Sequence, residues 1–184
     1  MTVEEVITVL AMQEEILQFN HFTNEDAWEL GNLLVAEAKK RELDTTVEIR
    51  LNNGYTVFKY AGNGTTPNNE IWADKMFASV SRMEKSTMLL YSELKRSEET
   101  MEDIGLGKEE YSCLGGGFPV RVEEVGVIGA IMVTNQSHFV NHDIIVKALS
   151  RYLHIDEVPN GPFPLLFQPA SSDVPFAGDD CSTN

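Results

Sequence analysis

Hydrophobic residues recur at helical spacing in the N-terminal part of this chain. Apolar positions three or four residues apart continue to about Phe19, and Thr2 with Glu5 forms the capping-box pattern of a helix start. A second apolar stripe follows Thr23, and the basic residues 39–41 suit the negative end of that helix's dipole. The pattern therefore predicts two amphipathic helices in succession.

After the second helix the hydrophobic period changes to two, as in a half-buried strand. Segment 46–51 alternates apolar and polar residues, and segment 55–61 returns as a second strand pattern. Asn53 and Gly54 stand between them, and both tolerate the positive φ of a tight hairpin turn. We predict an antiparallel hairpin here, with the apolar residues of the first strand on one face of a sheet.

A third helix is predicted from the segment that follows the hairpin. Thr66 suits an N-cap and Pro67 the first helical position, and one apolar face then continues to about Lys95. We therefore expect a single long helix across 67–95. The loop 62–67 before it could hold an anion with its backbone amides, or it could serve only to cap the helix.

The remaining pattern predicts further strands and a last helix. Segment 118–122 follows a glycine run, and segment 126–134 is almost continuously apolar, which is typical of a central strand. Asn141 or Ser137 caps the helix that comes next. This order of elements indicates the α/β fold class, with a mainly antiparallel sheet packed with helices in a sandwich.

The regular pattern stops at about residue 155. We assign residues 1–155 to a single α/β domain and residues 156–184 to an acidic, proline-containing C-terminal tail. Prolines break any periodicity in the tail, and its acidic residues are accompanied by no Lys or Arg. Residues 163–167 are more apolar than a solvated linker, so we expect them to pack against this domain or a neighbouring subunit.

The charge of the chain excludes several classes of partner. The 184 residues include 29 acidic and 14 basic ones, which gives a formal net charge of -15. Binding to nucleic acid or to anionic membranes needs a basic face, and no run of Lys or Arg supplies one. The N-terminus lacks a signal-peptide pattern, and Cys113 and Cys181 are expected to be free thiols. We expect a cytoplasmic protein that binds neither nucleic acid nor membrane.

Gly115, Gly116 and Gly117 are the first candidates for a binding site. A dinucleotide fingerprint needs its glycines between a strand and a helix, whereas these glycines precede a strand, so that motif is excluded. Two interpretations stay open. The glycines allow a tight entry into the strand beside neighbouring backbone, or they let the backbone approach a ligand closely.

His138 and His142 stand four residues apart, which on one helix places both imidazoles on the same face. Such a pair can hold a metal ion or haem iron, or the two can be helix-start and packing histidines. No nearby carboxylate or cysteine completes a ligand set, so we predict no metal site. No hydrolase triad or zinc motif is present, and the sequence leaves open whether the protein is an enzyme.

Two segments carry a family resemblance. Residues 64–72 read Gly-Thr-Thr-Pro-Asn-Asn-Glu-Ile-Trp, and residues 111–121 read Tyr-Ser-Cys-Leu-Gly-Gly-Gly-Phe-Pro-Val-Arg. Both resemble segments of the haem-degrading domain family, whose relatives include HbpS-like and GlcG-like proteins. The resemblance covers about residues 4–153 in order, which makes it specific to the family.

This resemblance implies an α/β sandwich that assembles into homo-oligomers and that binds or degrades haem. Two departures from the family's segments bear on that activity. Leu114 stands where the family has a histidine, and Lys75 followed by Met76 replaces a basic pair. A leucine can neither ligate iron nor exchange protons, so Leu114 cannot take over a role of that histidine.

The same motifs imply a ligand-binding site. Its expected residues are Asn69, Trp72, Gly115, Gly116, Phe118, Arg121 and His142. Arg121 would recognise a carboxylate of the ligand, or it would form a structural ion pair. Two functions follow: a protein that binds haem or a small carboxylate-bearing molecule, and a noncatalytic oligomeric scaffold that engages other proteins.

Overall fold

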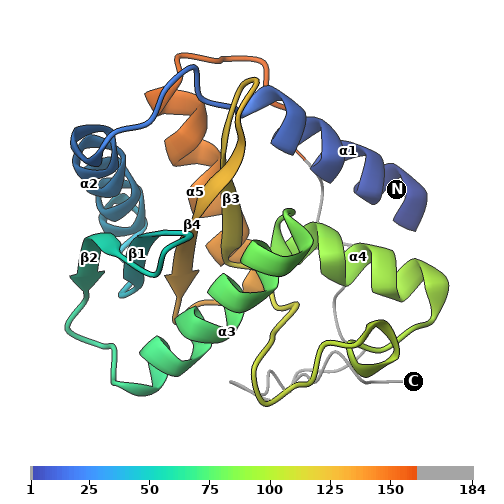
Figure 1. The fold of residues 1–184 in the computed structure, drawn as a ribbon. Coiled ribbons are helices and arrows are strands. Elements are labelled where there is room, and N and C mark those ends of the chain that lie inside the picture. The colour runs from blue at the N-terminus through green and yellow to red at the C-terminus, as the bar shows by residue number, and fades with distance from the viewer. Residues whose placement is uncertain (1, 161–184) are drawn as a thin grey trace.

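A four-stranded antiparallel sheet forms the centre of the protein, and α-helices cover it (Figure 1). The computed structural model describes residues 2–160. The strands are β1 Thr46–Leu51, β2 Thr56–Ala61, β3 Gly117–Val122 and β4 Gly126–Thr134, in the spatial order β2-β1-β4-β3. The α-helices are α1 Val3–Ile16, α2 Asn24–Lys40, α3 Asn68–Met83, α4 Thr87–Ser97 and α5 His138–Tyr152, and a short 3-10 helix covers Glu102–Ile104. The predicted α/β sandwich is confirmed.

The predicted hairpin is present. β1 and β2 pair antiparallel, with Val47 opposite Tyr60 and Ile49 opposite Phe58. Gly54 in the connecting turn has a φ of +88°, a conformation that glycine adopts at no steric cost. Val47 and Ile49 share the sheet face that packs into the core, where both are fully buried.

β4 is a central strand with two buried faces, as its continuous apolar sequence predicts. Ile131 and Val133 belong to a core shared with α2 and α5, whereas Ala130 and Met132 pack against α3 on the opposite face. Figure 1 shows α3 crossing one face of the sheet, with α1 and α4 side by side beyond it. The sheet therefore has one apolar layer on each side.

The helix starts largely follow the predicted capping patterns. The side chains of Thr2 and Thr23 each accept a hydrogen bond from the backbone N–H of an acidic residue three positions on. The carboxylate of that residue in turn accepts a bond from the backbone N–H of the threonine. Of the two caps considered for α5, Ser137 is the cap, and Asn141 lies inside the helix. His138 is consequently the first residue of α5.

The single long helix predicted across 67–95 is wrong. The chain leaves the helix after Met83 and forms two helices, α3 and α4. Glu84 adopts the left-handed conformation with a φ of 53°, and the side chain of Ser86 then caps α4 by accepting from the Leu89 N–H at 3.1 Å.

Tertiary contacts hold this break in place. The carboxylate of Glu14 on α1 accepts a hydrogen bond from the Ser86 N–H at 2.7 Å. The guanidinium of Arg121 on β3 donates to the carbonyl oxygen of Glu84 at 2.6 Å. Because these partners lie far away in the sequence, the apolar stripe that continues through the break gives no sign of it.

α1 ends at Ile16, before the predicted end at about Phe19. Phe19 instead runs alongside β3 in a parallel bridge. Its N–H donates to the Arg121 carbonyl at 2.9 Å, and its own carbonyl accepts from the Glu123 N–H at 2.8 Å. This bridge covers part of the outer edge of β3, whereas no strand within residues 2–160 pairs with the outer edge of β2.

Cys113 is buried, and no cysteine of the described chain is a free thiol. The predicted free thiol at this position is therefore wrong, and one ground for expecting a reducing compartment is lost. Cys181 lies outside the described residues. No helix within residues 2–160 is long and apolar enough to cross a membrane.

The start of the predicted tail is attached to the domain. Gln13 on α1 donates from its Nε2 to the carbonyl oxygen of Pro159 at 2.7 Å, and Val158 packs against the core. The apolar segment 163–167, for which we predict docking, lies outside the described residues.

Candidate functional site

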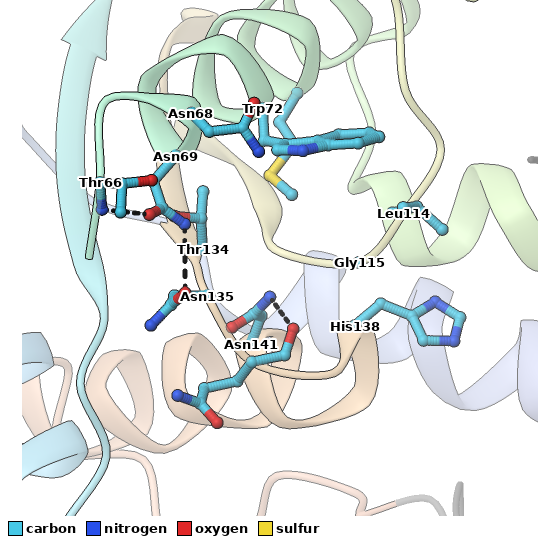
Figure 2. Close-up of a pocket in the computed structure, with 12 residues that line it drawn as sticks. Thr66, Asn68, Asn69, Trp72, Leu114, Gly115, Thr134, Asn135, His138 and Asn141 are labelled. Atoms are coloured by element: carbon cyan, nitrogen blue, oxygen red, sulfur yellow. Dashed lines mark hydrogen bonds between the residues drawn. The ribbon is translucent and has the colours of Figure 1, made fainter. Parts of the chain in front are cut away.

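A pocket of about 190 Å³ opens where the starts of α3 and α5 approach the loop before β3 (Figure 2). Three chain segments form it: the start of α3, the loop that leads into β3, and the end of β4 with the start of α5. The lining residues are Thr66, Asn68, Asn69, Trp72, Met76, Leu114, Gly115, Thr134, Asn135, Gln136, His138 and Asn141. Asn69, Trp72 and Gly115 are thus brought together as expected from the sequence.

The start of α3 contributes a buried amide and an indole. Asn69 is buried, and its Oδ1 accepts a hydrogen bond from the Thr66 N–H at 2.9 Å. Pro67 occupies the N-cap position and no side chain caps the helix, so the predicted Thr66 cap is wrong. Trp72 follows one turn later, and Figure 2 shows its indole across the pocket from Asn141.

The side-chain amides of Asn69, Asn135 and Asn141 lie close together near the end of β4. Asn69 Nδ2 donates to Asn135 Oδ1 at 3.4 Å, and Asn135 Nδ2 donates to the Asp44 carbonyl at 2.8 Å. Asn141 Nδ2 donates to the Gln136 carbonyl at 3.0 Å. Each amide nitrogen has an oxygen acceptor, and this fixes which way each carboxamide points.

Gly115 and Gly116 pack directly against neighbouring backbone. A Cβ on Gly115 would overlap the carbonyl oxygen of His138, and one on Gly116 would overlap that of Val133. Gly116 also has a φ of +135°, which L residues rarely adopt. The interpretation as a tight entry into the strand is confirmed, and close approach to a ligand stays a prediction for Gly115.

Phe118, Arg121 and His142 do not line this pocket. Phe118 is buried in the core that α2 and α5 share with the sheet, with its ring centroid 5.9 Å from that of His142. Arg121 donates to the carbonyl of Glu84 at the junction of α3 and α4. The residues expected to form one site therefore divide into pocket residues and residues that hold the surrounding elements.

The two histidines of α5 lie in different surroundings. His142 is buried against α1, and its Nε2 lies 2.9 Å from Gln13 Oε1. Burial lowers the pKa of His142 to about 3, with a smaller contribution from His138. His138 lines the pocket, and its ring centroid lies 4.0 Å from that of Phe139. Within residues 2–160, no group of three or more His, Cys, Asp or Glu side chains could hold a metal ion.

Sequence reasoning missed much of the polar lining. Asn135 and Gln136 directly follow the last residue of β4, and the sequence favours Asn141 only as a helix cap. A signal was available, because polar residues between a buried strand and a helix start often face the same end of a sheet as other loops. The Asn-Gln pair after the apolar run 126–134 is the pattern that could have indicated this part of the pocket.

The pocket-forming segments fall within a family match. The model of haem-degrading proteins described as HbpS-like matches residues 22–150. The chain belongs to this family. A UPF0303 protein of Serratia proteamaculans is 33% identical over 154 residues, which cover 83% of this chain and 95% of that protein. A UPF0303 protein of Streptomyces avermitilis is 35% identical over 148 residues, which cover 80% and 90%.

Solved structures support the fold of this HbpS-like protein. The crystal structure of Ybr137w protein matches with a TM-score of 0.74 and 20% identity, over 83% of this chain and 88% of that chain. HbpS matches with a TM-score of 0.58 and 23% identity, over 74% and 92%. A PduOC:heme complex matches with a TM-score of 0.59 and 16% identity, over 70% and 93%. At these identities the likeness shows the fold alone.

The family name raises the question of whether haem fits the pocket. Met76 and His138 line it, and both residue types ligate haem iron in proteins. Its volume of about 190 Å³, however, is below the roughly 300–1,000 Å³ of sites that enclose drug-sized ligands. Among the described lining residues no Lys or Arg is present to pair with propionates, and Leu114 stands at the family's histidine position. The pocket therefore does not fit an enclosed haem.

Proposed function

We propose that this member of the haem-degrading family binds a small molecule in the pocket between α3 and α5. The observation that carries the proposal is the convergence of Asn69, Trp72 and Gly115, from segments far apart in the sequence, on one concave site. A concave site with an aromatic side chain and a few convergent polar groups is the default location for a ligand.

Each pocket residue has a distinct role in this proposal. Trp72 supplies a flat face for stacking, and Gly115 lets the ligand approach the backbone. Asn69 anchors the polar floor through its bonds to Thr66 and Asn135. Phe118, Arg121 and His142 hold the elements around the pocket, so we expect them to affect stability more than ligand contact.

Haem-related binding is the class that the family suggests, and a structural neighbour is a complex with haem. Because the pocket does not fit an enclosed haem, we place haem behind a smaller ligand. A carboxylate-bearing ligand was expected from Arg121, and that expectation has less support because Arg121 bonds to Glu84 outside the pocket.

Fluorescence and absorbance titrations test the proposal. In a Trp28→Phe protein, Trp72 is the remaining tryptophan and reports on the pocket, while the Soret band reports on haem. Leu114→Phe should fill the pocket and abolish binding of the titrated ligand. Val125→Phe makes the same kind of change at a residue that is 71% exposed and outside the pocket, and it should leave binding intact. Equal binding by both variants would refute the site.

A separate surface favours the second candidate, a noncatalytic oligomeric scaffold. Trp28 on α2 is 58% exposed, and its ring centroid lies 6.0 Å from that of Phe58 on β2. Tyr55 is 64% exposed beside the same strand, whose outer edge pairs with no strand of residues 2–160. Exposed aromatic residues beside an unpaired edge suit association with another chain.

Homo-oligomerisation and a cytoplasmic location stay predictions from the sequence. Sedimentation of the full chain tests the first, with Trp28→Ser as the variant that should weaken self-association. Met12→Ser, at another exposed apolar residue on α1, is the matched control. A full-length protein that sediments as a monomer would remove the homo-oligomer from this proposal.

A further inference from the structure

The carboxamide of Asn141, a residue that lines the pocket, has a partner at one end only. Its Nδ2 donates to the Gln136 carbonyl at 3.0 Å, which identifies the opposite atom as Oδ1. Asn141 is 3% exposed, and no polar atom within residues 2–160 hydrogen bonds to this oxygen. A buried acceptor without a partner is costly, so the site favours a ligand that supplies a donor.

Several other polar side chains of the pocket already have hydrogen-bond partners. Asn69 Oδ1 accepts from the Thr66 N–H, and the hydroxyl of Thr134 bonds to that of Thr46 at 2.5 Å. Asn135 bonds through both ends of its carboxamide. Asn141 Oδ1 is a buried acceptor of the lining that accepts no hydrogen bond from residues 2–160.

The lining carries no fixed charge. Asp, Glu, Lys and Arg are all missing from the described residues that line the pocket. A charged ligand would lose hydration on entry and gain no counter-charge from the lining itself, and the ammonium of Lys75 outside it lies over the Trp72 ring, 5.2 Å from the ring centroid. The start of α3 and the start of α5 border the pocket, and the partial positive charge of helix starts suits a carbonyl oxygen. These features favour an uncharged polar ligand.

The shape of the pocket favours a flat ligand. Figure 2 shows the indole of Trp72 on one side and Asn141 on the other. Met76 and Leu114 add apolar surface between the polar groups. A planar ring can stack on an indole face and contact the thioether, while a substituent at its rim reaches Asn141.

We propose that the pocket binds a small, uncharged, planar molecule that donates an N–H or O–H group to Asn141 Oδ1. This inference rests on the function proposed above, because it names the ligand class of the same site. An aromatic carboxamide combines the required features: a planar ring, an N–H donor and a carbonyl oxygen.

Three probes with one ring separate the contributions of donor and charge. Benzamide has the donor, N,N-dimethylbenzamide lacks it, and benzoate replaces it with a negative charge. Each is titrated against the Trp28→Phe protein, with Trp72 fluorescence as the readout. We expect benzamide to bind at least about tenfold more tightly than either of the others, as for one buried hydrogen bond.

A substitution at the acceptor completes the test. Asn141→Leu, of similar size, should weaken benzamide about tenfold and leave N,N-dimethylbenzamide unchanged. Asn32→Leu, on the exposed face of α2, is the control and should change neither. The comparison of the three probes needs no substitution in the pocket, so it tests the inference even if Asn141→Leu fails to fold.

The outcomes distinguish this inference from the proposed function. Equal binding of benzamide and N,N-dimethylbenzamide overturns the inference and indicates that only water meets Asn141. Binding of benzoate or haem without benzamide also overturns the inference, but it leaves the small-molecule site standing. If benzamide, benzoate and haem all leave Trp72 and the Soret band unchanged, the proposed function itself is refuted.

Discussion

Gln13 on α1 accepts a hydrogen bond from His142 on α5, with 2.9 Å between Gln13 Oε1 and His142 Nε2. The direction follows from the other end of Gln13, whose Nε2 donates to the carbonyl of Pro159. His142 therefore carries its proton on Nε2 as a neutral imidazole. A single glutamine joins α1, α5 and the segment that follows α5.

Acid should destabilise the protein through His142. Its pKa is about 3 in the folded state against 6.5 for an unperturbed histidine, so the unfolded state binds more protons between these values. The stabilising contribution is complete above pH 6.5 and is lost as the pH falls toward 3. The free energy of unfolding should fall by up to about 1.4 kcal/mol per pH unit from this group.

Denaturant unfolding at a series of pH values measures this slope. His142→Gln cannot titrate and should flatten the slope by up to one proton in that window. His154→Gln, at an exposed histidine of the segment after α5, is the matched control. An identical slope in wild type and His142→Gln would contradict the prediction.

Glu14 should show the opposite dependence on pH. Burial raises the pKa of Glu14, although hydrogen bonds from Ser86 partly oppose the shift. Its contribution to stability is complete below the unfolded pKa of 4.5 and is lost as the pH rises through the folded pKa. Glu14→Gln keeps an acceptor for the Ser86 N–H and does not ionise. It should become more stable than the wild type as the pH rises above 4.5.

Thermal melts at acidic and neutral pH compare these proteins. Glu15→Gln, at the neighbouring exposed position, is the matched control. Its stability relative to the wild type should not change with pH in this way. A constant difference between Glu14→Gln and the wild type at all pH values would show that ionisation of Glu14 does not contribute.

Glu84→Gly should stabilise the protein. Glu84 ends α3 in the left-handed conformation, which glycine adopts without the clash of a Cβ. The bond from Arg121 reaches the backbone carbonyl of residue 84 and survives the change. We expect the free energy of unfolding to rise by about 0.5–1 kcal/mol. The same change at Glu29, inside α2, should lower the free energy of unfolding by a similar amount. A lower free energy of unfolding for both variants would argue against relief of the left-handed conformation as the cause.

Tyr152→Phe should raise the pKa of Asp26. Burial raises this pKa, but hydrogen bonds from the Tyr152 hydroxyl, at 2.7 Å, and from Thr23 lower it more. Loss of the Tyr152 bond should also cost about 1 kcal/mol of stability above the carboxyl's pKa. An NMR titration of the Asp26 carboxyl measures the shift, and Tyr55→Phe at an exposed tyrosine is the control. An unchanged Asp26 titration would show that the hydroxyl does not stabilise the carboxylate.

Local patterns predicted the elements well where the cause is local. The hairpin follows from an alternating strand and an Asn-Gly turn, and the starts of α1 and α2 follow from Thr2 and Thr23. The break after Met83 could not be predicted in the same way, because its partners, Glu14 and Arg121, come from other elements. The helical period continues through it, since α3 and α4 both bury apolar faces.

The candidate site was predicted in part. Family motifs indicated Asn69, Trp72 and Gly115, which the fold brings to one pocket. The same motifs also contain Phe118 and Arg121, but strand alternation and the packing of β3 direct them to the core and to the α3–α4 junction. A motif read as a linear string cannot separate residues on opposite faces of one strand.

The two glycines at the entry to β3 have a consequence for genetics. A side chain at Gly115 or Gly116 would collide with the backbone carbonyls of His138 or Val133. In a saturation mutagenesis screen both positions should therefore tolerate no replacement. Variants at either position should show low protein abundance. Such a screen would mark these glycines as essential whatever the ligand is. Substitution tolerance at Trp72 and Asn141, normalised to abundance, is the better guide to selection for binding.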